Sequence, residues 1–166
     1  MGRMKVNGLY EYTQRLKELG TVDKVNRVVK TAIYDGAKII ADAIKEEIDT
    51  IPVVGPNDYG TTYHPLNGAT QEQLEGLRNG VGIALMRQSD SGWDTKVGFS
   101  GYNSKHTDAY PEGQPNLMIA ASIESGASFR RKNPFITRAI RRSKQIAVKA
   151  MDETAEKQIM QIYGGI

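Results

Sequence analysis

The residues of this sequence that could do chemistry are cations, and they gather in one stretch. Between Arg130 and Lys149 lie eight lysines and arginines and no acidic residue. The rest of the 166-residue chain carries 14 basic and 19 acidic residues, a net charge of −5. Guanidinium and ammonium groups bind phosphates and carboxylates. This basic block, residues 130–149, therefore predicts contact with an anion, either the phosphates of DNA or an acidic patch on another subunit.

Local helix stability does not explain the basic block. The block begins a long helical pattern, and cations at the N-terminal end of a helix are disfavoured by about 0.3–1 kcal/mol each. Acidic residues follow only in the later half of the pattern. The ordinary alternative is a solvated helix face, but charges that oppose the helix dipole favour an external partner. The candidate contact residues are Arg130, Arg131, Lys132, Arg138, Arg141 and Arg142.

No set of residues indicates catalysis. The chain has no cysteine, and neither of its two histidines, His64 and His106, has further ligands at the spacing of a metal site. The Walker phosphate loop, the dinucleotide-binding loop and the serine nucleophile elbow are all missing. Glu46 and Glu47 fall on the polar face of a predicted helix, where solvation is the ordinary explanation. We expect no enzyme and no cofactor; a hydrolase that uses His64 or His106 is a rival hypothesis.

Two long helices are predicted to position these residues. Apolar residues recur every three or four positions over residues 22–48, and again over residues 136–162. Thr21 is a candidate N-cap of the first helix. Asn133 and Pro134 precede the second, where an asparagine side chain can accept a free backbone N–H and proline loses only a donor that would be unpaired.

Shorter elements fill the rest of the chain. A short amphipathic helix is expected over residues 9–19. Thr70 and Gln73 form a capping-box pattern, and Asn116 is a candidate cap for a short helix that runs to Glu124.

The middle of the chain predicts a small sheet and two long loops. Residues 80–87 and 93–100 are typical of two strands joined by turn residues, which indicates an antiparallel hairpin. Residues 51–70 and 101–115 are polar and rich in proline or glycine, which indicates irregular loops. The fold class is α+β, with two long helices packed on a small antiparallel β-sheet and long irregular loops.

Aromatic residues flank the cations and fill the loops. The helical register of Phe135 predicts a core position, whereas Phe129 precedes the cations in a loop and could anchor a neighbouring subunit. Tyr102, His106 and Tyr110 could stack on bases, but a polar loop with tyrosines more often contacts protein.

We expect one domain over residues 1–166. Its parts are N-terminal helices at 5–50, loops and hairpin at 51–115, and a turn and C-terminal helix at 116–166. No apolar run approaches the roughly 18 residues that would span a bilayer, and the basic N-terminus lacks the apolar region of a secretory signal. We expect a chain made in the cytoplasm, with no membrane partner.

The order of these pieces resembles the tailed-phage neck proteins known as tail-completion, head–tail joining or minor tail proteins. The resemblance covers roughly residues 5–160. Its residues are Gly8-Leu9 through Leu16, Gly76-Leu77-Arg78-Asn79, the turn Glu124-Ser125-Gly126, and the helix start Pro134-Phe135-Ile136-Thr137-Arg138-Ala139. The chain departs from the family in its first loop, where a longer stretch, residues 52–68, replaces the usual short run.

The resemblance implies a non-enzymatic virion protein, made in the host cytoplasm. Its copies would form a ring where the tail tube meets the head connector, and DNA would pass through the lumen. It also implies that the long loops contact adjacent rings. Phe129 and the turn from Glu124 to Gly126, next to Pro134 and Phe135, would set the docking angle of the last helix. The alternative function is a stand-alone nucleic-acid-binding protein that uses the basic block.

Overall fold

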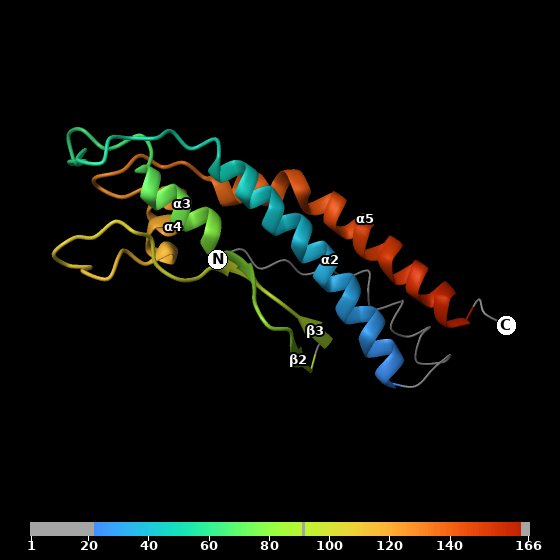
Figure 1. Ribbon diagram of the computed structural model, residues 1–166. Coiled ribbons are helices and arrows are strands. Elements are labelled where there is room, and N and C mark those ends of the chain that lie inside the picture. The colour runs from blue at the N-terminus through green and yellow to red at the C-terminus, as the bar shows by residue number, and fades with distance from the viewer. Residues whose placement is uncertain (1–21, 91, 164–166) are drawn as a thin grey trace. The chain divides into compact units, whose positions relative to one another are not determined.

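The computed structural model describes residues 22–90 and 92–163, which form an α+β structure (Figure 1). Its helices are α2 (Val22–Ile48), α3 (Gln71–Gly80), α4 (Asn116–Ser125) and α5 (Phe135–Tyr163). Both long helices are confirmed close to their predicted bounds. The short helix predicted over residues 9–19 and the candidate cap Thr21 lie outside the described residues. Among the described helices, none is long and apolar enough to cross a membrane.

The predicted hairpin is confirmed, but it is divided into two short two-stranded sheets. β1 (Val81–Ile83) pairs with β4 (Val97–Phe99), and β2 (Arg87–Ser89) pairs antiparallel with β3 (Gly92–Asp94). Between the two sheets the backbone N–H of Ala84 still donates to the carbonyl of Lys96 at 2.8 Å. The Thr95 hydroxyl also donates to the Ala84 carbonyl at 2.6 Å, so a side chain partly replaces the ladder.

The chain contacts divide into two compact units, and each unit contains part of both long helices. Among the described residues, unit 1 comprises 22–40, 83–96 and 143–163, and unit 2 comprises 41–82 and 97–142. Each unit gathers segments that are far apart in sequence. The expected single domain over residues 1–166, with its three parts along the chain, stays a prediction.

In unit 1, α2 packs on α5 through valine, alanine and methionine side chains. The buried cluster consists of Val25, Val28, Val29, Ala32, Met151 and Ala155. Trp93 of β3 packs against this cluster, and its indole N–H donates to the side-chain oxygen of Asn26 at 3.0 Å. The ammonium group of Lys30 lies 3.8 Å from the centre of the Trp93 ring. The second hairpin sheet is thereby attached to α2.

In unit 2, the core surrounds the first residue of α5. Phe135 is fully buried, and its ring meets that of Phe99 edge to face, with centroids 6.1 Å apart. Leu77 of α3 and Ile123 of α4 are also fully buried, and these two short helices lie against each other. The core position predicted for Phe135 is confirmed.

The ends of the short helices partly follow the predictions. The capping box is confirmed, because the Thr70 hydroxyl accepts the N–H of Gln73 and the Gln73 side chain accepts the N–H of Thr70. The cap predicted at Asn116 is wrong: Pro115 occupies the cap position, and Asn116 is only 2% exposed. Its side-chain amide instead donates to the carbonyl of Ser100 at 2.8 Å, which joins the end of β4 to α4.

Candidate functional site

The candidate site in unit 2 is built on irregular backbone that hydrogen bonds hold in place. The N–H of Leu66 donates to the carbonyl of Phe129 at 2.9 Å, and the N–H of Arg131 donates to the carbonyl of Leu66 at 2.8 Å. Gly60 lies so close to this pair that a Cβ there would be 1.8 Å from the Phe129 carbonyl oxygen. A side chain at residue 60 would therefore separate the two segments.

The two predicted loops are irregular, and a backbone hydrogen bond joins the two ends of each loop. In the first loop, Ala69 donates to the carbonyl of Pro52 at 3.1 Å. In the second, Asn103 donates to the carbonyl of Gln114 at 3.0 Å. The Lys105 ammonium group donates to the carbonyl of Pro56 and so links the two loops. The loops thus have defined shapes within unit 2.

These loops and the segment between α4 and α5 expose large aromatic side chains, which we call the aromatic loop surface: Tyr59, Tyr63, Tyr102 and Phe129. Tyr63 is 90% exposed and Phe129 is 45% exposed. Aromatic residues are enriched at the centres of protein interfaces, where they bury a large area with few rotatable bonds. The exposure of Phe129 is compatible with the predicted anchor, which stays a prediction.

Arg130 lies in the interior, contrary to its predicted place at an external contact. Its side chain is 4% exposed, and Nη2 donates to the Gln73 side-chain oxygen at 3.1 Å. Its Nε and Nη1 have no hydrogen-bond partner among the residues that the structure describes. Burial lowers the pKa of the Arg130 guanidinium, because the charged form loses its hydration. DNA or a neighbouring subunit cannot reach this group without a rearrangement.

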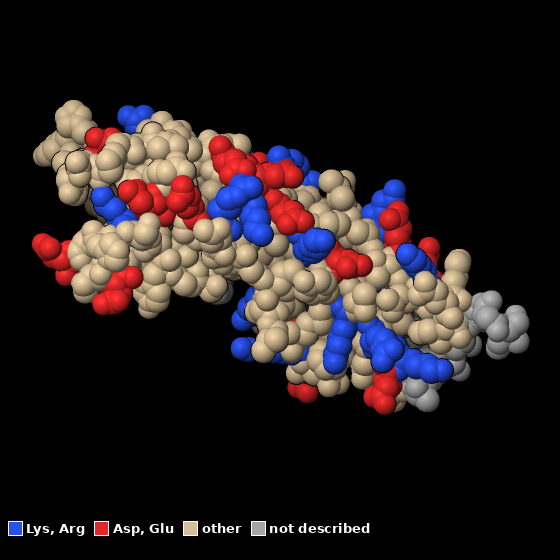
Figure 2. Space-filling view, viewed as in Figure 1, with Lys and Arg blue, Asp and Glu red and all other residues tan. Residues whose placement is uncertain are grey.

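Two further cations of the basic block pair with α2. Nε of Arg138 lies 2.9 Å from a carboxylate oxygen of Glu47, and the Arg142 guanidinium lies 2.7 Å from Glu46 and 3.4 Å from Glu47. Figure 2 shows basic and acidic atoms side by side over the C-terminal part of α2. The sequence predicts that both glutamates are solvated, but Glu47 is only 7% exposed. Arg138 and Arg142 therefore have an internal role in unit 2.

The remaining candidate cations are free to meet a partner. The side chains of Arg131, Lys132 and Arg141 are exposed and make no ion pair with the residues that the structure describes. They come from the same segment as Phe129 and from the second turn of α5. Among the six candidate contact residues, an external anion contact is thereby reduced to these three, for which it stays a prediction.

The turn before α5 is held by Glu124. Its carboxylate accepts the N–H of Ile136 at 2.8 Å and the N–H of Thr137 at 3.1 Å. The side-chain cap predicted for Asn133 is wrong, since that side-chain oxygen accepts from Nη1 of Arg138 at 2.8 Å. Gly126 ends α4 with a φ of +79°, which other residues rarely adopt.

The histidines do not build a metal site. His64 and His106 are both exposed and lie in different loops, and Nδ1 of His106 is 2.6 Å from the Pro111 carbonyl oxygen. Across residues 22–90 and 92–163, no three histidine, aspartate or glutamate side chains gather as a ligand set.

Known proteins do not resolve the function. No family model, no curated protein and no solved structure matches this chain. A fold class such as α+β hosts many functions, so the side chains of the site are the evidence for function. The features of unit 2 that bear on function are the aromatic loop surface and the three cations that make no ion pair with the described residues, Arg131, Lys132 and Arg141.

Proposed function

We propose that the protein is a structural subunit of the tailed-phage neck type, which binds other protein subunits through its aromatic loop surface. Copies of the chain would form a ring in the virion of a phage or prophage, and this ring would join the tail tube to the head connector. At low concentration the isolated chain would be a monomer, and it would associate into larger species as its concentration rises. Arg131, Lys132 and Arg141 would face either the DNA-bearing lumen or a neighbouring subunit.

One observation carries this proposal. The aromatic loop surface stands on backbone that is already hydrogen-bonded, as at Leu66, which pairs with both Phe129 and Arg131. A surface that is ordered before binding loses little conformational entropy when a partner arrives. Exposed tyrosines on an ordered loop therefore favour a protein contact over a solvated loop of no function.

Self-association tests the proposal. We expect sedimentation velocity of the purified chain to show larger species as its concentration rises, and electron microscopy to show closed rings among them. Tyr63→Ser should reduce this association because it removes the most exposed aromatic side chain of the surface. Tyr34→Ser is the matched control, since Tyr34 is 51% exposed on α2 in unit 1. Association that is unchanged by Tyr63→Ser would contradict the proposed surface.

A stand-alone nucleic-acid-binding protein is the alternative. It would bind a labelled DNA duplex tightly as a monomer, and its affinity would fall steeply with salt as phosphate contacts are lost. The burial of Arg130 and the pairing of Arg138 and Arg142 leave the basic block with fewer free cations for that role. The neck proposal expects weak DNA binding, measured by fluorescence anisotropy at several salt concentrations.

A further inference from the structure

Unit 1 carries a second concentration of positive charge, which does not form a block in the sequence. A groove of about 360 Å³ lies between the beginning of α2 and the end of α5. Its lining residues are Lys24, Arg27, Gln158, Gln161 and Ile162. Figure 2 shows basic atoms gathered over the beginning of α2.

The cations of this groove have no acidic partner among the described residues. Lys24 and Arg27 are exposed and make no ion pair there, and the neighbouring Asp23 makes none with either. Lys30 follows at the same three-residue spacing and rests on Trp93 instead of an acid. Cations in the first turns of a helix also oppose its dipole. An anion bound here would offset the repulsion among these cations and the unfavourable interaction of the cations with the helix dipole.

The other walls of the groove suit a carboxylate group. Gln158 and Gln161 bring side-chain amides, which donate hydrogen bonds and carry no charge of their own. Ile162 packs against the buried cluster of unit 1 and supplies an apolar wall. Two cations, two amides and one apolar side chain therefore converge on the same space.

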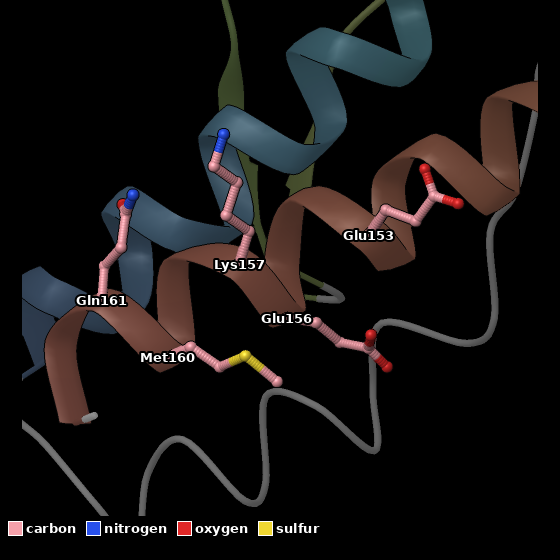
Figure 3. Close-up of a pocket in the computed structure, with 5 residues that line it drawn as sticks. All are labelled: Glu153, Glu156, Lys157, Met160 and Gln161. Atoms are coloured by element: carbon pink, nitrogen blue, oxygen red, sulfur yellow. The ribbon is translucent and has the colours of Figure 1, made fainter.

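A second hollow adjoins the groove, and acidic, basic, polar and apolar side chains line it. Its volume is about 440 Å³, and Gln161 lines both spaces. Figure 3 shows Lys157 and Gln161 extending from one side of α5, and Glu156 and Met160 from another. Met160 is 69% exposed, so an apolar side chain of a partner could rest on it.

We propose that the groove binds carboxylate side chains on an acidic segment of another protein. Lys24 and Arg27 would hold the carboxylates, the two glutamines would donate N–H groups, and Met160 would contact an apolar neighbour in the same segment. This site goes beyond the proposed neck function, because it lies in unit 1 and uses no residue of the aromatic loop surface.

A nucleic acid fits the site less well. A phosphate chain that continued from the groove into the adjoining hollow would run past the carboxylates of Glu153 and Glu156. The nearby aromatic residue Trp93 cannot stack on a base in this arrangement, because Lys30 covers its ring and its indole N–H is bound to Asn26. A protein segment can place single carboxylates at the cations and avoid both obstacles.

The site can be tested by titrating the full chain with hexaglutamate. Binding is monitored through the side-chain amide signals of Gln158 and Gln161 in ¹H–¹⁵N spectra. We expect both signals to shift at low ionic strength. The double variant Lys24→Glu, Arg27→Glu should weaken binding about tenfold, because repulsion replaces attraction. The matched control is Lys38→Glu with Lys96→Glu, which changes the net charge equally at exposed cations of unit 1 outside the groove. The affinity of this control variant for hexaglutamate should stay within about twofold of the wild-type value.

Three results would overturn the proposal. The first is equal weakening by both double variants, which would mean that only net charge matters. The second is the absence of shifts at Gln158 and Gln161. The third is binding of hexathymidylate as tight as that of hexaglutamate, which would make the groove a phosphate site. If the first double variant does not fold, Gln161→Ala removes an exposed donor and should weaken hexaglutamate binding on its own; unchanged affinity would also refute the site.

Discussion

The carboxylate of Glu124, at the end of α4, accepts the backbone N–H of Ile136 in the first turn of α5 at 2.8 Å. The same carboxylate accepts the N–H of Thr137 at 3.1 Å and its hydroxyl at 2.5 Å. The first N–H groups of a helix have no acceptor within it, and the helix dipole favours a negative charge there. A residue of the preceding helix therefore fixes where α5 begins.

Glu124→Ala is expected to lower the free energy of unfolding by about 1–2 kcal/mol, because a capping acceptor is lost at a partly buried helix start. Glu124→Gln should lose less, since it keeps an oxygen acceptor. Ser125→Ala is the control, because Ser125 is exposed. Urea unfolding followed by circular dichroism measures all three. Equal stability of Glu124→Ala and the wild type would show that the start of α5 does not depend on this cap.

Phe135→Ala should destabilise the fold by about 3–5 kcal/mol, because it removes a fully buried ring and leaves a cavity. Phe129→Ala makes the same chemical change at a ring that is 45% exposed, so a loss below about 1 kcal/mol is expected. The same urea unfolding experiment compares the two. A loss under 1 kcal/mol for Phe135→Ala would contradict its place in the core.

Periodic patterns made the long elements predictable. α2 and α5 follow from apolar residues that recur with helical spacing, and the capping box at Thr70 follows from a local pattern within four residues. The predicted hairpin appeared for the same reason. In each case the deciding contacts lie close together in the sequence.

The candidate site was less predictable, because its side chains find partners far along the chain. Arg138 meets Glu47 across 91 residues, and Arg130 meets Gln73 across 57. Neither pairing leaves a local signal. Asn116 and Asn133 were plausible caps by residue type, but tertiary hydrogen bonds to Ser100 and from Arg138 engaged their side chains instead. The run of cations in the sequence therefore does not form one continuous basic surface in the structure.

Glu47→Ala is expected to lower the free energy of unfolding by about 1–3 kcal/mol, because Arg138 and Arg142 lose an acceptor that is largely buried. Glu46→Ala is the matched change on the same helix. Its side chain is 69% exposed, so the loss should stay below about 1 kcal/mol. Similar losses from both variants in urea unfolding would contradict the central role of Glu47.

Glu72 is expected to make the stability of the protein depend on acid pH. Hydrogen bonds from its own backbone N–H and from the Thr70 hydroxyl lower the pKa of Glu72. A lowered pKa in the folded state stabilises the fold above the ordinary glutamate value of about 4.3, and this contribution is lost as pH falls through the folded pKa. Wild type should therefore exceed Glu72→Gln in unfolding free energy at pH 7, and the gap should narrow at pH 3. A gap that is the same at both pH values would contradict this role.

Arg130→Met and Arg130→Glu should differ sharply in stability. Methionine fills a similar space without a charge, and replacing a half-satisfied buried ion by an apolar residue is often neutral or stabilising. We expect Arg130→Met to stay within about 1 kcal/mol of the wild type in urea unfolding. Arg130→Glu would bury a carboxylate beside the Gln73 oxygen and should cost about 3–5 kcal/mol.

Charge reversal at Arg131 and Lys132 is expected to affect assembly without affecting the stability of the fold. Both side chains are exposed and unpaired among the described residues, so Arg131→Glu with Lys132→Glu should leave urea unfolding within about 0.5 kcal/mol of the wild type. Self-association in sedimentation velocity should nevertheless weaken if these cations face an acidic neighbour. If they face the lumen instead, association should persist while DNA passage and infectious particle yield fall. Unchanged association together with normal infectious particles would remove both residues from the proposed function.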